Sequence, residues 1–232
     1  ILVSLQVVPL TINYINPTRY GIWLTLSSIV AWLSYFDLGF AHGFRNRFAE
    51  AVAKGDMQLA REYVSTTYVV LSLLFSSVFL IAIVVNHFVD WSAILNVDAA
   101  YSSELNIVFG ILAFFFCLNI VASIFTTMLT ANQKPALASL IQTLGQVFGF
   151  ICIYILTKTV PGNLDVLAFA FSGVPCFLLI IISIGMFLSG RYRHLSPSFH
   201  FVHFSLTKKI VGLGGQFFII MISMLFVFQL IN

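Results

Sequence analysis

The chain has 232 residues, of which 60% are hydrophobic and only 8% are charged. A soluble domain carries roughly 25% charged residues, so this composition excludes a water-soluble globular protein. The formal net charge of +3 is small and comes from local clusters, which argues against a nucleic-acid partner and favours anionic lipid head groups.

Long apolar segments follow one another along the chain. Residues 1–15 are too short to span a bilayer core of ~30 Å, and we interpret them as part of a membrane helix that begins earlier. Further segments are long enough to span at ~1.5 Å per residue. They are residues 20–40, 63–85, 107–129, 136–156, 166–188 and 210–230. The sequence predicts an all-α polytopic membrane protein with about seven transmembrane helices, and the apolar end suggests a piece of a longer protein.

Lys and Arg residues gather on alternate loops between these segments. The loops 41–62, 130–135 and 189–209 hold all of them except Arg19 and Lys158. Membrane insertion leaves cationic loops in the cytoplasm, so we expect these three loops to be cytoplasmic. Anionic lipids are the expected partners of the chain at that face.

Asp37 is the only charged residue within the six full-length segments. A charge at membrane depth costs ~2.5–3.5 kcal/mol even on the mildest scale, so this side chain should face protein or water. Two interpretations are open. Asp37 is either an ion-coupling or gating carboxylate, or a structural cap or ion pair at the end of its helix.

Arg45 and Arg47 lie in the basic loop that follows. The orientation of the chain explains both of them. A second role explains them equally well: capture of a phosphate-bearing head group, because a guanidinium group offers two parallel N–H donors. For Lys54 and Arg61, which lie further along the loop, orientation is the favoured interpretation.

Glycines indicate one helix break and two close helix contacts. Gly55 suits the residue after a helix, and Asp56 suits the N-cap of the next one. Two pairs of glycines at a four-residue spacing allow helix backbones to approach closely. These pairs are Gly39 with Gly43, and Gly145 with Gly149.

Polar side chains recur at three- and four-residue steps in the segments 107–129 and 136–156, so each set lies on one helix face. Helix packing explains these faces. A cavity for a polyhydroxylated solute also explains them, because sugars need hydrogen-bond partners rather than charge. In that case Asn119, Gln142 and Gln146 are the candidate substrate contacts.

Motifs of catalysis are absent from the sequence. It contains no HExxH, GxSxG or Walker A pattern, and His200 and His203 lack a third metal ligand. We therefore expect a protein that is not an enzyme and that holds neither a metal nor a cofactor.

Several short stretches share a pattern with one transporter family. They are YGIWLTLSS at 20–28, DLG at 37–39, RN at 45–46, AE at 49–50, ANQKPA at 131–136, PS at 197–198 and GGQFF at 214–218. Together they resemble bacterial polysaccharide flippases of the O-antigen translocase type, in the multidrug/oligosaccharidyl-lipid/polysaccharide exporter superfamily. The resemblance covers nearly the whole chain.

The resemblance implies two six-helix lobes that work by alternating access in the bacterial inner membrane. Residues 1–188 would be the first lobe, 189–209 the cytoplasmic connection and 210–232 the first helix of the second lobe. The implied cargo is an oligosaccharide linked to a lipid diphosphate, such as an O-antigen or capsule repeat unit, and polysaccharide assembly proteins are further possible partners. Arg45 and Arg47 would attract the diphosphate.

Two other functions remain open at this point. A multidrug-type antiporter on the same fold would need acidic residues for cationic drugs, and only Asp37 supports it. A polytopic glycan polymerase or transferase would need a sizeable outer loop with catalytic residues. The candidate loop, residues 86–106, is short and contains no Arg.

Overall fold

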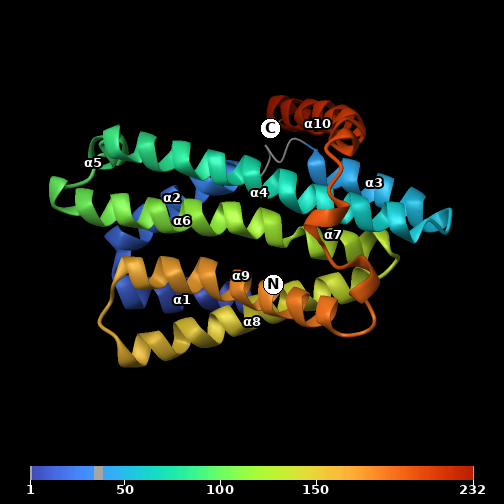
Figure 1. Cartoon of the computed structure of the whole chain (residues 1–232). Coiled ribbons are helices and arrows are strands. Elements are labelled where there is room, and N and C mark those ends of the chain that lie inside the picture. The colour runs from blue at the N-terminus through green and yellow to red at the C-terminus, as the bar shows by residue number, and fades with distance from the viewer. Residues whose placement is uncertain (1, 34–38, 232) are drawn as a thin grey trace. The chain divides into compact units, whose positions relative to one another are not determined.

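The computed structural model describes residues 2–33 and 39–231, and the regular secondary structure within these ranges is helical throughout (Figure 1). The helices are α1 (Leu2–Ile15), α2 (Pro17–Leu33), α3 (Phe40–Ala53), α4 (Met57–Phe88), α5 (Trp91–Leu95), η2 (Ala99–Tyr101), α6 (Ser102–Ala122), α7 (Ile124–Ala131), α8 (Pro135–Thr159), α9 (Leu164–Leu188), η3 (Arg193–Leu195), η4 (Phe199–Phe201) and α10 (Ser205–Ile231).

Four stretches in the described part of the chain are long and apolar enough to cross a membrane. They are Met57–Phe88, Ala99–Ala131, Pro135–Thr159 and Leu164–Leu188. Each contains one of the predicted segments. The all-α class is confirmed for the described residues, and the four candidate spans suggest a multi-pass membrane protein. The predicted segment 20–40 begins in α2, and the predicted segment 210–230 lies within α10. That these two segments cross the membrane stays a prediction.

The prediction of one helix for the first full-length segment was wrong near the C-terminal end of that segment. We expected one helix over 20–40, but Phe40 opens a separate helix, α3, after a break at Gly39. Helix α2 is described as far as Leu33. Gly39 precedes α3 with φ of 68°, a left-handed conformation that a continuing α-helix does not contain. Asp37 lies outside the described residues.

The predicted helix over 107–129 is interrupted at Ser123, between α6 and α7. The Ser123 hydroxyl donates to the carbonyl oxygen of Ile120 at 2.7 Å. The Ser123 carbonyl in turn accepts from the hydroxyls of Thr126 and Thr127, at 2.9 and 3.0 Å. The Ser123 carbonyl also accepts from the amide of Thr127 at 3.0 Å, so its helical bond is kept and the hydroxyl bonds satisfy these polar groups locally.

The predicted break at Gly55 and Asp56 is confirmed. Gly55 has φ of 76°, and the Asp56 amide donates to the carbonyl oxygen of Ala51 at 3.0 Å, as in a Schellman ending. The Asp56 carboxylate then accepts from the amide of Leu59 at 2.9 Å and so caps α4.

The described chain divides into two compact units, and the boundaries fall within long helices. Unit 1 comprises Ile1–Ala31, Phe75–Asn119 and Leu140–Ile181. Unit 2 comprises Trp32–Leu74, Ile120–Ser139 and Ile182–Asn232.

In unit 1, α8 and α9 meet through small residues. A Cβ atom on Gly145 would lie 3.2 Å from the Cβ atom of Pro175, and one on Gly149 would lie 3.5 Å from its Cγ atom. The glycine pair therefore forms the predicted close contact. Gly173 also leaves room for the ring of Phe115, which packs edge-on against Phe169 and Phe177.

In unit 2, α3 packs on α7 and on α10. The contact with α10 is made by backbone: a Cβ atom on Gly43 would overlap the carbonyl oxygen of Ile210, and one on Gly39 would overlap that of Gly214. The second predicted glycine contact is thus also confirmed. It brings the first turns of α10 against α3 and positions the site described next.

Candidate basic pocket

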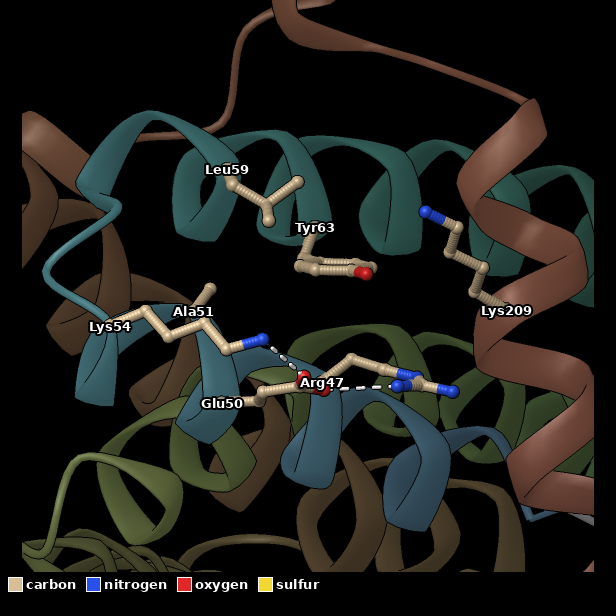
Figure 2. Close-up of a pocket in the computed structure, with 7 residues that line it drawn as sticks. All are labelled: Arg47, Glu50, Ala51, Lys54, Leu59, Tyr63 and Lys209. Atoms are coloured by element: carbon tan, nitrogen blue, oxygen red, sulfur yellow. Dashed lines mark hydrogen bonds and ion pairs between the residues drawn. The ribbon is translucent and has the colours of Figure 1, made fainter.

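A pocket of about 280 Å³ lies where α3, α4 and α10 come together in unit 2 (Figure 2). Its lining residues are Arg47, Glu50 and Ala51 from α3, Lys54 at the C-cap of α3, Leu59 and Tyr63 from α4, and Lys209 from α10. We refer to these residues as the basic pocket.

The amphipathic sequence of α3 turns its polar side chains toward this pocket. Phe40, Phe44, Phe48 and Ala51 recur at three- and four-residue spacing, and all are buried. Burial of that face fixes the rotation of the helix. It leaves Arg47, Glu50 and Lys54 on the part of the surface that faces α4 and α10.

Glu50 holds two of the cations. Its carboxylate accepts from Arg47 Nη1 at 2.9 Å and from Lys54 Nζ at 2.7 Å (Figure 2). The hydrogen bond from Lys54, followed by the one from Arg47, holds the pKa of Glu50 below its ordinary value. The carboxylate is therefore ionised at neutral pH and keeps both cations in place.

Positive charge exceeds negative charge in the basic pocket. Three cationic side chains, from Arg47, Lys54 and Lys209, face one carboxylate. Lys209 makes no hydrogen bond or ion pair with the described residues, and its amino group points toward the ring of Tyr63 (Figure 2). Arg47 Nε is buried and has no hydrogen-bond partner. Unused donors and excess positive charge suit an anion with several oxygen acceptors, such as phosphate.

The structure separates the two arginines that the sequence grouped together. Arg47 lines the basic pocket, whereas Arg45 is exposed and does not. Asn119, Gln142 and Gln146 also lie outside the basic pocket, with exposed side chains on α6 and α8. Their proposed contact with sugar stays a prediction.

Lys209, Tyr63 and Glu50 are pocket residues that the sequence did not single out as site candidates. In the sequence, Lys209 is one of the loop cations that indicate the orientation of the chain in the membrane. Tyr63 is the first residue of a predicted membrane segment. The spacing of Gly39 and Gly43 did predict that another helix packs closely against α3. Nothing in the sequence identified α10 as that neighbour.

A second arginine site, in unit 1, has balanced charges. Arg19 Nε lies 3.2 Å from Glu104 Oε1, and Arg19 Nη2 donates to Glu104 Oε2 at 3.3 Å. Arg19 Nη1 donates to the carbonyl oxygen of Gly162 at 3.5 Å, and Asp165 lies within electrostatic range. We call Arg19, Glu104 and Asp165 the Arg19 cluster. It ties α2 to α6 and to the turn between α8 and α9.

The acidic residues of the 86–106 loop have structural partners. The Asp90 carboxylate caps α5 by accepting from the amides of Ser92 and Ala93, and the Asp98 carboxylate accepts from the amide of Ala100. Glu104 belongs to the Arg19 cluster. Within the described ranges, no group of three or more His, Cys, Asp or Glu side chains could hold a metal ion.

Comparison of the chain with family models, with curated proteins and with solved structures finds no match.

Proposed function

We propose that this chain is the first lobe of a membrane flippase that moves an oligosaccharide linked to a lipid diphosphate from the cytoplasmic to the outer leaflet. The observation that carries the proposal is the excess of cationic donors in the basic pocket, beside helices suited to span a membrane. Most of α3 lies in the predicted cytoplasmic loop 41–62, and Lys209 ends the predicted cytoplasmic loop 189–209, on the side where such a cargo is assembled.

The side chains of the basic pocket have distinct roles in this proposal. Arg47 presents parallel N–H donors to one phosphoryl group, and Lys209 attracts the second as a point charge. Glu50 holds Arg47 and Lys54 in place through its two ion pairs and limits how tightly the anion binds. A transporter needs such a limit, because cargo that binds too tightly is not released.

The sugar part of the cargo needs hydrogen-bond partners instead of charge. We assign this role to the exposed amides of Asn119, Gln142 and Gln146. Asp37 is our candidate for coupling transport to an ion gradient, and Arg45 for the first attraction of the diphosphate. The same proposal places the protein in the bacterial inner membrane, with polysaccharide assembly proteins as partners.

An antiporter for cationic drugs is the alternative function on the same fold. The charge of the basic pocket favours an anionic cargo over a cationic one. A polymerase or transferase has less support, because Asp90, Asp98 and Glu104 of the 86–106 loop serve as caps and in an ion pair.

The test replaces two cations of the basic pocket with neutral side chains of similar length, in cells that express the complete protein. We expect Arg47→Gln combined with Lys209→Gln to lower glycan export by roughly tenfold or more, because each charged hydrogen bond contributes ~1.5–3 kcal/mol. Binding of inorganic pyrophosphate to the purified protein, followed by calorimetry, should fall in parallel.

The matched control is Lys208→Gln, which removes a neighbouring charge on α10 that does not line the basic pocket. Accessibility of engineered cysteines verifies that each variant keeps the wild-type orientation. Unchanged export and unchanged pyrophosphate binding in the double variant would refute the proposal.

A further inference from the structure

A second cavity in unit 2 has a different chemical character. A groove of about 460 Å³ runs between α4 and the segment 189–204 that connects α9 to α10, a size typical of small-ligand sites. Apolar and aromatic side chains form most of its wall, including Tyr68, Val69 and Leu73 of α4, with Pro197 and Phe199 opposite. We call it the α4 groove.

Hydrogen bonds from α4 hold the far wall of the groove in place. Arg61 Nε donates to the carbonyl oxygen of Ser196 at 2.9 Å, and the guanidinium group lies 4.2 Å from the ring centroid of Phe201. The amide of Ser198 donates to Ser65 Oγ at 3.1 Å, and the amide of His203 donates to Thr66 Oγ1 at 3.0 Å. These contacts fix the connecting segment against α4 and so define the shape of the groove.

Large apolar side chains stand exposed at the rim of the groove. Leu73 is 60% exposed and Phe199 is 87% exposed. Phe204, a short distance further along the chain, is 63% exposed. Exposed apolar area of this kind calls for an apolar partner, and α4 is itself long and apolar enough to lie in a membrane.

The charge around the groove restricts the kind of partner. The connecting segment itself contains no Asp or Glu, and Arg191 and Arg193 shortly precede the groove-lining residue Pro197. The α4 carboxylate that faces the segment, Glu62, lies 3.7 Å from His203. Both arginines are exposed. Cations near a membrane surface each attract anionic head groups, while zwitterionic lipids gain little from them.

We propose that the α4 groove binds one acyl chain of an anionic phospholipid, whose head group lies against the cations of the connecting segment. The lipid is a resident ligand and not cargo. Its acyl chain fills the apolar wall between α4 and the connecting segment, and its phosphate offsets the unmatched charge of Arg191 and Arg193. The inference stands apart from the proposed function, since no residue of the basic pocket takes part.

The test measures retained lipid by native mass spectrometry of the complete protein from nanodiscs of phosphatidylglycerol and phosphatidylcholine in equal parts. We expect wild-type protein to retain phosphatidylglycerol selectively. Val69→Trp should fill the groove and lower retention roughly tenfold, because excluding even two methylene groups removes about that much binding. Leu73→Trp tests the same wall at an exposed position that tolerates a larger side chain.

Two further variants separate the parts of the proposal. Ile81→Trp is the matched control, because Ile81 is an exposed α4 residue that does not line the groove. Arg191→Gln with Arg193→Gln should abolish the preference for phosphatidylglycerol. Equal retention in wild type, Val69→Trp and Leu73→Trp would overturn the proposal. Loss of lipid from the variant Arg47→Gln with Lys209→Gln would also overturn the proposal. A mass that corresponds to a protein dimer, with no bound lipid, would overturn it as well.

Discussion

The Arg19 cluster and the basic pocket both place an arginine beside a glutamate, yet the two sites differ in charge balance. In the Arg19 cluster, one cation meets Glu104 and Asp165, and its guanidinium group also reaches the carbonyl oxygen of Gly162. In the basic pocket, Arg47 and Lys54 share Glu50, and Lys209 has no hydrogen-bond or ion-pair partner among the described residues.

The difference indicates what each arginine can do. The guanidinium group of Arg19 bonds to Glu104 and to the carbonyl oxygen of Gly162, which both belong to unit 1. Arg19 therefore contributes to the stability of the fold. The Nε atom is buried without a hydrogen-bond partner in both arginines, so it does not distinguish them. What sets Arg47 apart is the excess of cations beside a cavity of about 280 Å³, where an incoming anion can still gain from its charge. Local sequence does not distinguish the two cases, because the balance depends on residues from distant helices.

The strongest way to break this comparison is to separate α10 from α3. A Cβ atom on Gly214 would lie 2.6 Å from the carbonyl oxygen of Gly39, so Gly214→Ala should force the helices apart. We expect a loss of about 2–3 kcal/mol in the free energy of unfolding, measured in detergent, and weaker pyrophosphate binding as Lys209 moves away.

Gly212→Ala is the matched control for that experiment. It adds the same methyl group to the same helix, where no atom lies within 4 Å. It should leave pyrophosphate binding unchanged and stabilise the helix by up to ~1 kcal/mol. Equal effects of both substitutions would contradict a backbone contact between α3 and α10.

The second experiment neutralises Glu104, one of the two carboxylates that balance the charge of Arg19 in the Arg19 cluster. Glu104→Gln leaves a partly buried guanidinium group without its carboxylate and should cost ~2 kcal/mol of stability, discounted for partial exposure. Pyrophosphate binding should not change. Asp98→Asn, a control in the same loop, should be near neutral because asparagine caps helices as well as aspartate does. Weaker pyrophosphate binding in Glu104→Gln would show that the Arg19 cluster is not purely structural.

The smallest expected effect concerns Glu50 and pH. Its pKa lies below the ordinary value, so the contribution of its ion pairs to stability is present at neutral pH and is lost as pH falls through the lowered pKa. Protonation of Glu50 frees Arg47 and Lys54. Sulfate, whose charge is constant in this pH range, should then bind a few-fold more tightly.

Glu50→Gln should bind sulfate more tightly at neutral pH and lose the acid-dependent gain. Glu62→Gln, outside the pocket, should behave as wild type.

The parts of the fold that the sequence predicted are those governed by local physics. Apolar length identified four spans, and Gly55 with Asp56 identified the end of α3 and the start of α4. The glycine spacing at 39/43 and 145/149 also predicted close contacts correctly. In each case the deciding residues lie within a few positions of one another.

The missed features depend on competition or on distance along the chain. A hydropathy pattern registers apolar length and not an interruption of one residue, so the break at Ser123 between α6 and α7 was not foreseen. Arg45 and Arg47 have the same chemistry, and only the rotation of α3, fixed by Phe44 and Phe48, separates them. Lys209 enters the basic pocket through a partner helix that the sequence could not assign.

The connecting segment is held to α4 largely through its own main chain. The carbonyl of Ser196 and the amides of Ser198 and His203 make the bonds, and these groups occur in nearly every residue type. Side chains at 196 and 198 can therefore vary without loosening the attachment. A cysteine at either position could carry a fluorescent label that reports on movement of the segment while leaving its attachment intact.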